Sequence, residues 1–121
     1  MRLEVTYRSL QGKPEIRRRA EALFKKLHRF LDPAAEGKLM LAADHGRVVS
    51  ELVVSAHGHV FKCIEEADEL RSALDATFHT MEGQLRRAKD RRTEHRGAAE
   101  EQAESEVSSA PESEEYERPL L

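Results

Sequence analysis

Hydrophobic and polar residues alternate at the very start of the chain. Leu3, Val5 and Tyr7 share one side of an extended segment, and charged or polar residues occupy the other side. A period of two predicts a half-buried strand over residues 2–7. Later runs rich in Val and Leu predict three further strands, over residues 38–43, 48–56 and 60–65.

Two longer segments repeat hydrophobic residues every three or four positions, which is the period of an amphipathic helix. The first begins at Pro14, whose missing N–H suits a first helical position, and is expected to end at Asp32-Pro33. The second follows Asp68, which we expect to be its N-cap. The two apolar stripes are Ile16, Ala20, Leu23, Phe24, Leu27, Phe30 and Leu31 in the first helix, and Leu70, Ala73, Leu74, Thr77, Phe78, Met81 and Leu85 in the second.

The last three strands are joined by two short connections, each containing a His-Gly pair. These connections are Asp44-His45-Gly46-Arg47 and Ala56-His57-Gly58-His59. Glycine adopts positive φ freely, and histidine is mildly enriched there, so both connections predict tight hairpins. The first strand precedes a helix, so it should run parallel to the second strand through a right-handed crossover.

The predicted order is therefore β-α-β-β-β-α. Each helix has one apolar stripe that must be buried. Placing both helices on one face of a four-stranded sheet buries both stripes and gives a two-layer α+β sandwich. The other face of the sheet is then expected to face solvent.

Charge is distributed unevenly along the 121 residues. The chain has 20 Lys and Arg against 23 Asp and Glu, a net charge of −3. Residues 1–96 contain 19 basic and 15 acidic residues, a net charge of +4, whereas residues 97–121 contain one arginine and eight glutamates, a net charge of −7. We therefore expect a basic folded domain over residues 1–96 and an acidic disordered tail over 97–121.

The basic residues gather at the end of the second helix, where five of the seven positions from 86 to 92 are Lys or Arg. A cationic helix C-terminus is favourable with the helix dipole, so a solvated helix end is one interpretation. A second interpretation is favoured by the basic side of the first helix and by Arg8, which is expected in the connection before that helix. Together these charges would form one surface for the phosphates of structured RNA, read by shape rather than by base edges.

Several classes of protein are disfavoured. Cys63 is the only cysteine, which excludes an intramolecular disulfide. We expect Cys63 to be a small buried residue of a strand. His57 and His59 are expected to be turn residues rather than metal ligands. The chain has no nucleophile-elbow motif and no glycine-rich phosphate loop, and we predict no enzyme, cofactor or metal site. With no long apolar run and no signal-peptide pattern, the protein is expected to be cytoplasmic.

Several stretches resemble a known family. They are Arg2–Tyr7 followed by Arg8, Ile16-Arg17, Lys26-Leu27-His28-Arg29-Phe30, Glu69 to Asp75, and Met81 to Arg87. In this order and spacing the chain resembles the ribosome hibernation-promoting factors and ribosome-associated translation inhibitors over residues 1 to 95. The acidic tail, in place of a second domain, resembles the short forms of the family.

The resemblance implies the same sandwich fold and binding of the small ribosomal subunit and its ribosomal RNA. Family members occupy the channel for messenger and transfer RNA and so inhibit translation by idle ribosomes under stress. The matching positions predict RNA contacts from Arg8, Lys26, Arg29, Arg87 and Arg91, and the charge pattern adds Arg86 and Lys89. Thr80 and Gly83 stand where the family often has basic residues, and Arg19 stands where an aromatic residue is common.

Two questions stay open at this point. A protein-interaction module that uses the exposed sheet face is the alternative function. The acidic tail either keeps the protein soluble or covers the basic surface in competition with RNA. In either case we expect no membrane partner and no small-molecule substrate, and a monomer when the protein is off the ribosome.

Overall fold

The computed structural model describes residues 1–98, with side chains to Arg92. The predicted acidic tail, residues 97–121, lies outside the described residues except for Gly97 and Ala98, which belong to the last helix rather than to a disordered segment. The elements are β1 (Arg2–Arg8), α1 (Pro14–Lys25), a 3₁₀ turn η1 (His28–Phe30), β2 (Glu36–Asp44), β3 (Arg47–Ala56), β4 (His59–Ala67) and α2 (Leu70–Ala98). The predicted order is confirmed. Each strand is longer than predicted by one to three residues, because backbone pairing continues beyond the apolar core of each run.

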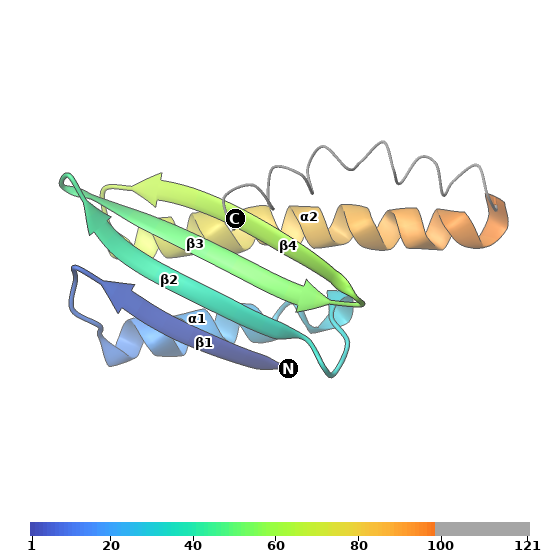
Figure 1. Ribbon diagram of the computed structural model, residues 1–121, viewed down its shortest axis with the longest axis horizontal. Helices are drawn as coiled ribbons and strands as arrows, with labels where there is room; N and C mark the ends of the chain where they lie inside the picture. The colour runs from blue at the N-terminus through green and yellow to red at the C-terminus, as the bar shows by residue number, and fades with distance from the viewer. Residues whose placement is uncertain (99–121) are drawn as a thin grey trace.

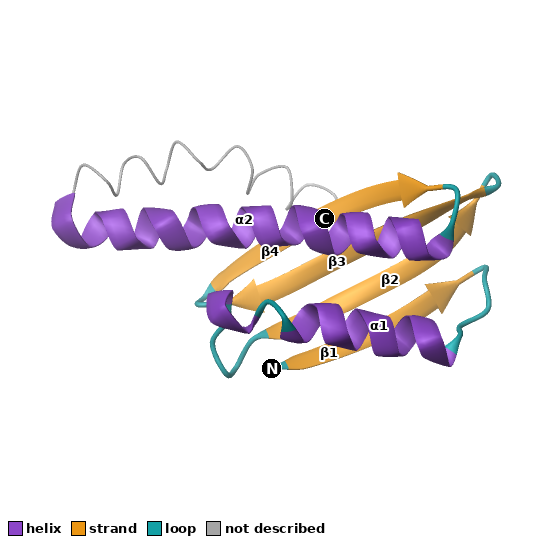
Figure 2. Cartoon of the chain, turned by 180° about the vertical axis from the view of Figure 1, so that it is seen from behind, coloured by secondary structure: helices purple, strands orange, loops and turns teal. Residues whose placement is uncertain are grey.

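The four strands form one sheet in the order β1-β2-β3-β4 (Figure 1). The pairing of β1 with β2 is parallel, and the other two pairs are antiparallel, as the crossover and the two hairpins predict. Figure 2 shows both helices on the same side of this sheet. We call that side the helix layer and the opposite side of the sheet the open face. The two-layer α+β fold is confirmed.

Both hairpin turns contain only the two residues between the paired ends of the strands. His45 and Gly46 have φ values of 53° and 80°, and His57 and Gly58 have 54° and 77°. Positive φ at both central residues is the geometry that matches the twist of the flanking strands. The His-Gly pairs are therefore explained by backbone conformation, as predicted.

The first helix ends earlier than predicted. The α-helix stops at Lys25, and the chain tightens into the 3₁₀ turn η1 before leaving the helix layer at Leu31. Leu27 and Phe30 are three residues apart, and in a 3₁₀ turn such residues lie above one another on one side. Both are buried, so the tighter turn keeps the apolar stripe directed at the sheet.

The start of α2 also differs from the prediction. The helix begins at Leu70, and the carbonyl of Glu69 accepts the first helical hydrogen bond, from the N–H of Ala73 at 3.0 Å. Asp68 is not the N-cap, because its carboxylate instead pairs with Arg47 of β3 at 3.2 Å. This ion pair fixes the loop between β4 and α2 to the neighbouring strand.

The core lies between the sheet and the helix layer, and both predicted apolar stripes face it. Leu39, Leu41, Leu52 and Val54 project from the sheet and are fully buried. Gly37 is required by close packing, since a Cβ there would lie 2.9 Å from the ring of Phe24. The core is thus made by residues whose periodicity identifies them in the sequence.

Candidate nucleic-acid interface

The two sides of the molecule differ in charge. Residues 14–30 and 70–92, which form the helix layer, contain twelve basic and five acidic residues. The open face carries equal numbers of both kinds: Arg2, Arg8, Lys38, Arg47 and Lys62 against Glu4, Glu36, Asp44, Glu51 and Glu66. Positive charge therefore accumulates on the helix layer, which is the side suited to a polyanion.

Ion pairs strengthen this contrast. On the open face, Lys62 binds Glu51 at 2.8 Å, and Arg47 lies 3.4 Å from Glu66. Paired cations have little attraction left for a distant polyanion, because the carboxylates already neutralise them. The helix layer keeps a surplus of basic side chains after its own pairs are formed.

Three cations of the helix layer surround one aromatic ring. The guanidinium carbons of Arg29 and Arg86 lie 5.1 and 5.8 Å from the ring centroid of Phe30, and the ammonium of Lys89 lies 5.7 Å from it. We call these four residues the Phe30 cluster. It brings a basic residue from η1 next to two from α2, which is the convergence of the two helical segments that the sequence predicted. Arg86 also binds Glu82 one turn earlier, at 2.7 Å.

The two helices are also joined by a bidentate ion pair, about three helical turns before this cluster along α2. Arg19 of α1 donates through Nε and Nη2 to the two carboxylate oxygens of Asp75 in α2, at 2.7 and 2.8 Å. These hydrogen bonds, and secondarily the charge of Arg19, hold the pKa of Asp75 below its ordinary value. Lys26 lies seven residues after Arg19, so two helical turns place its exposed side chain on the same flank of the α1 segment.

We expect Asp75→Asn to lower the melting temperature by a few degrees near neutral pH, because it removes a partly exposed charge-assisted pair. The folded pKa of Asp75 is depressed, so this stabilisation is present above the unfolded pKa of about 3.9 and disappears as pH falls through the folded pKa. The melting curves of the two proteins should therefore converge in acid.

Asp90→Asn is the matched control, since it removes an exposed carboxylate from the same helix. Its melting temperature should follow that of the wild type. A difference between wild type and Asp75→Asn that persists at low pH would contradict the assigned role of the ion pair.

Arg87 and Arg91 lie on the other flank of α2. They continue the row of Thr80 and Gln84, which hydrogen-bond to β4: Thr80 to the Glu65 carboxylate at 2.8 Å, and Gln84 to the Lys62 carbonyl at 3.2 Å. Arg87 is exposed and Arg91 is half-buried. The predicted RNA-contacting residues of α2 thus divide between two sides of one helix, with Arg86 and Lys89 facing η1.

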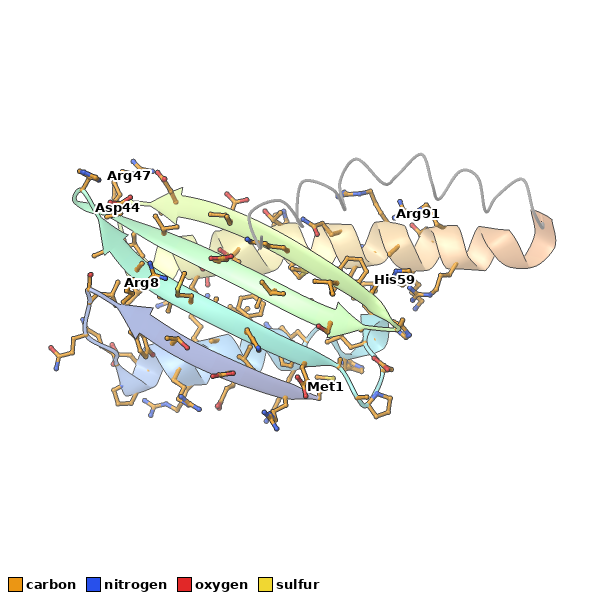
Figure 3. All side chains as sticks on the ribbon, in the orientation of Figure 1. Met1, Arg8, Asp44, Arg47, His59 and Arg91 are labelled. Atoms are coloured by element: carbon orange, nitrogen blue, oxygen red, sulfur yellow. The ribbon has the colours of Figure 1, made fainter. Side chains whose placement is uncertain are left out.

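Arg8 is placed differently from the prediction. It is the last residue of β1, not part of the connection, and its side chain lies on the open face (Figure 3). There its Nη2 is 3.3 Å from the sulfur of Met40 in β2. Because successive strand residues point to opposite faces, one additional residue of strand turns Arg8 away from the helix layer. The structure therefore does not bring Arg8 together with Lys26, Arg29, Arg86 and Lys89.

Comparison with known proteins identifies the family. A family model described as sigma 54 modulation protein / S30EA ribosomal protein matches residues 3–93. The chain belongs to this family. The match spans the sheet and both helices of the S30EA-family domain, and the predicted family is confirmed.

Solved structures agree with this assignment. The N-terminal domain of Protein Y from Thermus thermophilus is 25% identical, with a TM-score of 0.67, and the match covers 72% of this chain and 98% of that chain. A ribosomal subunit interface protein from Coxiella burnetii is 22% identical, with a TM-score of 0.61, covering 74% and 99%. No curated protein sequence matches the chain.

Two residues of this S30EA-family domain were not predicted to act at the site. Arg19 forms the inter-helix ion pair, and Phe30 was predicted only as a core residue.

A cavity of about 370 Å³ adjoins Arg19, lined also by Lys13, Glu15, Ile16, Leu70 and Arg71. Among the described residues, no three potential metal ligands come together, and no helix is long and apolar enough to cross a membrane.

Proposed function

We propose that this protein binds the small ribosomal subunit in the channel for messenger and transfer RNA and inhibits translation by idle ribosomes through steric occupancy. The observation that supports this most directly is the Phe30 cluster, in which basic residues from both helical segments converge on one side of an S30EA-family domain. The name of the similar Coxiella burnetii structure, a ribosomal subunit interface protein, is consistent with a ribosomal partner.

The affinity for ribosomal RNA comes, in this proposal, from basic side chains that neutralise its phosphates. Lys26, Arg29, Arg86, Arg87 and Lys89 are exposed on the helix layer, and Arg91 is half-buried beside them. Each basic side chain that replaces a counterion on RNA makes binding more favourable and more dependent on salt. Contacts of this kind recognise the shape and backbone of ribosomal RNA. Inhibition then requires only that the domain occupy space needed by messenger and transfer RNA, with no chemical step.

The same proposal covers the extent of the domain, its oligomeric state and the role of the open face. Residues 1–96 are the ribosome-binding domain, which acts in the cytoplasm and is a monomer before it binds. The open face, where basic and acidic residues are equal in number and Arg47 and Lys62 form ion pairs, points away from RNA. The alternative of a protein-interaction module on that face gains no specific support from these charges.

Sedimentation with purified ribosomal subunits tests the proposal. The protein should pellet with the small subunit at low salt and dissociate as salt rises. If about six phosphates are contacted, the logarithm of the binding constant should fall against the logarithm of salt concentration with a slope of about −4 to −5. If the protein does not pellet with the small subunit at low salt, the proposal is contradicted.

Competition tests the location. A messenger RNA fragment and transfer RNA bound beforehand to the small subunit should reduce binding, because they fill the proposed channel. Undiminished binding to such filled subunits would contradict steric occupancy, even if binding to empty subunits is strong.

A further inference from the structure

Phe30 is buried, although it lies next to three exposed cations. The residue is only 4% exposed at the end of η1, while Arg29, Arg86 and Lys89 remain accessible at the surface. All three cationic groups lie within 6 Å of one ring centroid. The ring is therefore the apolar surface that these three side chains share.

Gathering like charges on one ring has an electrostatic cost that the ring itself reduces. Three cations at this spacing repel one another, and exposed arginine and lysine side chains would otherwise spread into solvent. The face of an aromatic ring carries partial negative charge and attracts cations within about 6 Å of its centre. Glu82 also offsets part of the charge of Arg86, through the contact at 2.7 Å.

The backbone around Phe30 is fixed from two directions. Its N–H donates to the carbonyl of Leu27 at 2.9 Å within the 3₁₀ turn. Its own carbonyl lies 3.1 Å from Nε2 of His57, in the turn between β3 and β4. The backbone N–H of His57 lies 3.3 Å from the carboxylate of Asp32. The hairpin thus holds the backbone of η1 against the sheet, and this fixes the point from which the ring projects.

We propose that Phe30 is a positioning residue, whose ring preorganises Arg29, Arg86 and Lys89 as one site for a backbone phosphate of RNA. This inference rests on the proposed function, and it places one phosphate of the bound RNA at these three cations. Two guanidinium groups and one ammonium group converge there from two segments of the chain, and a phosphate offers several acceptor oxygens to such donors. Holding the cations together before binding reduces the ordering that binding would otherwise require.

Replacing Phe30 by leucine separates positioning from charge. Phe30→Leu keeps an apolar side chain under the cluster and keeps all three cations, but it removes the ring. We expect binding to purified small ribosomal subunits to weaken about tenfold, with a nearly unchanged salt slope, because the same charges still meet phosphate. Phe30→Tyr retains a ring and should bind within about twofold of the wild type.

Phe24→Leu is the matched control. Phe24 is a buried aromatic residue of α1, and in the described part of the chain no arginine or lysine lies over its ring. Its replacement should lower the melting temperature as Phe30→Leu does, yet leave binding unchanged. Nuclear magnetic resonance gives a direct readout: the Nε–H protons of Arg29 and Arg86 should be shifted upfield by the ring in wild type and Phe30→Tyr, but not in Phe30→Leu.

Two results would overturn the inference. One is folded Phe30→Leu that binds within about twofold of the wild type, and the other is an equal loss of affinity in Phe24→Leu. If replacing Arg29, Arg86 and Lys89 by alanine abolishes binding while Phe30→Leu does not, the proposed function stands and the positioning role fails. If the wild-type protein does not bind small subunits at all, both proposals fail together.

Discussion

Reversing Arg86 and Lys89 to glutamate is expected to weaken binding to the small ribosomal subunit by about a hundredfold or more. The double variant removes two phosphate contacts from the Phe30 cluster and introduces repulsion in their place. Fewer phosphates neutralised also means a shallower salt dependence, with the log–log slope reduced by about 2. Both quantities can be measured by sedimentation at several salt concentrations.

The matched control is Arg8→Glu with Lys38→Glu. This variant changes the net charge by the same amount, but both residues lie on the open face, on neighbouring strands. General attraction to RNA falls equally in the two variants, so any difference between them reports which side of the domain meets RNA. We expect the control to bind within about fivefold of the wild type, since long-range attraction is screened over about 10 Å in moderate salt. Equal losses would contradict the helix layer as the interface.

Cys63 is expected to react with thiol reagents about a thousandfold more slowly than a free cysteine at about pH 8. Burial, and secondarily the charge of Glu65, raises the pKa of its thiol from 9.0 to about 12, so very little thiolate forms. The residue is 7% exposed, and its Sγ donates to the Thr77 carbonyl at 3.3 Å. Alkylation followed by mass spectrometry measures the rate, which should become ordinary in concentrated guanidinium.

The same pKa predicts how stability changes in alkali. A folded-state pKa above the unfolded value gives stability that is complete below the unfolded pKa and is lost as pH rises toward the folded pKa. The free energy of unfolding should therefore fall between the ordinary thiol range and a pH of about 12. Cys63→Ala should lack this part of the decline. Rapid labelling of the native wild-type protein near neutral pH would show that the thiol is not buried as described.

The parts of this protein that sequence predicts well are those governed by a short-range period. Alternation in β1, the apolar stripes of the helices and the His-Gly turns each depend on residues a few positions apart, and each is confirmed. The predicted end of α1 at Asp32-Pro33 was wrong, because Leu27 and Phe30, three residues apart, fit an α-helix and a 3₁₀ turn equally well. Only packing against the sheet decides between these two conformations.

The candidate site depends on features that short-range periods in the sequence do not predict. Arg8 was assigned to the helix side, and a single further strand residue reversed its direction. The pairing of Arg19 with Asp75 joins residues 56 positions apart and depends on how the two helices are oriented, which no local pattern records. By contrast, the division of α2 into Arg86 and Lys89 on one flank and Arg87 and Arg91 on the other follows from helical spacing alone.

The inert, buried thiol makes this chain convenient for spectroscopy. Because Cys63 is the only cysteine, the native protein offers no reactive surface thiol. One cysteine added at Thr6, an exposed position of β1 on the open face, could then carry a fluorophore without interference. A probe there would sit on the side opposite the helix layer, so fluorescence could follow the arrival of the protein on a ribosome in real time while leaving the basic surface untouched.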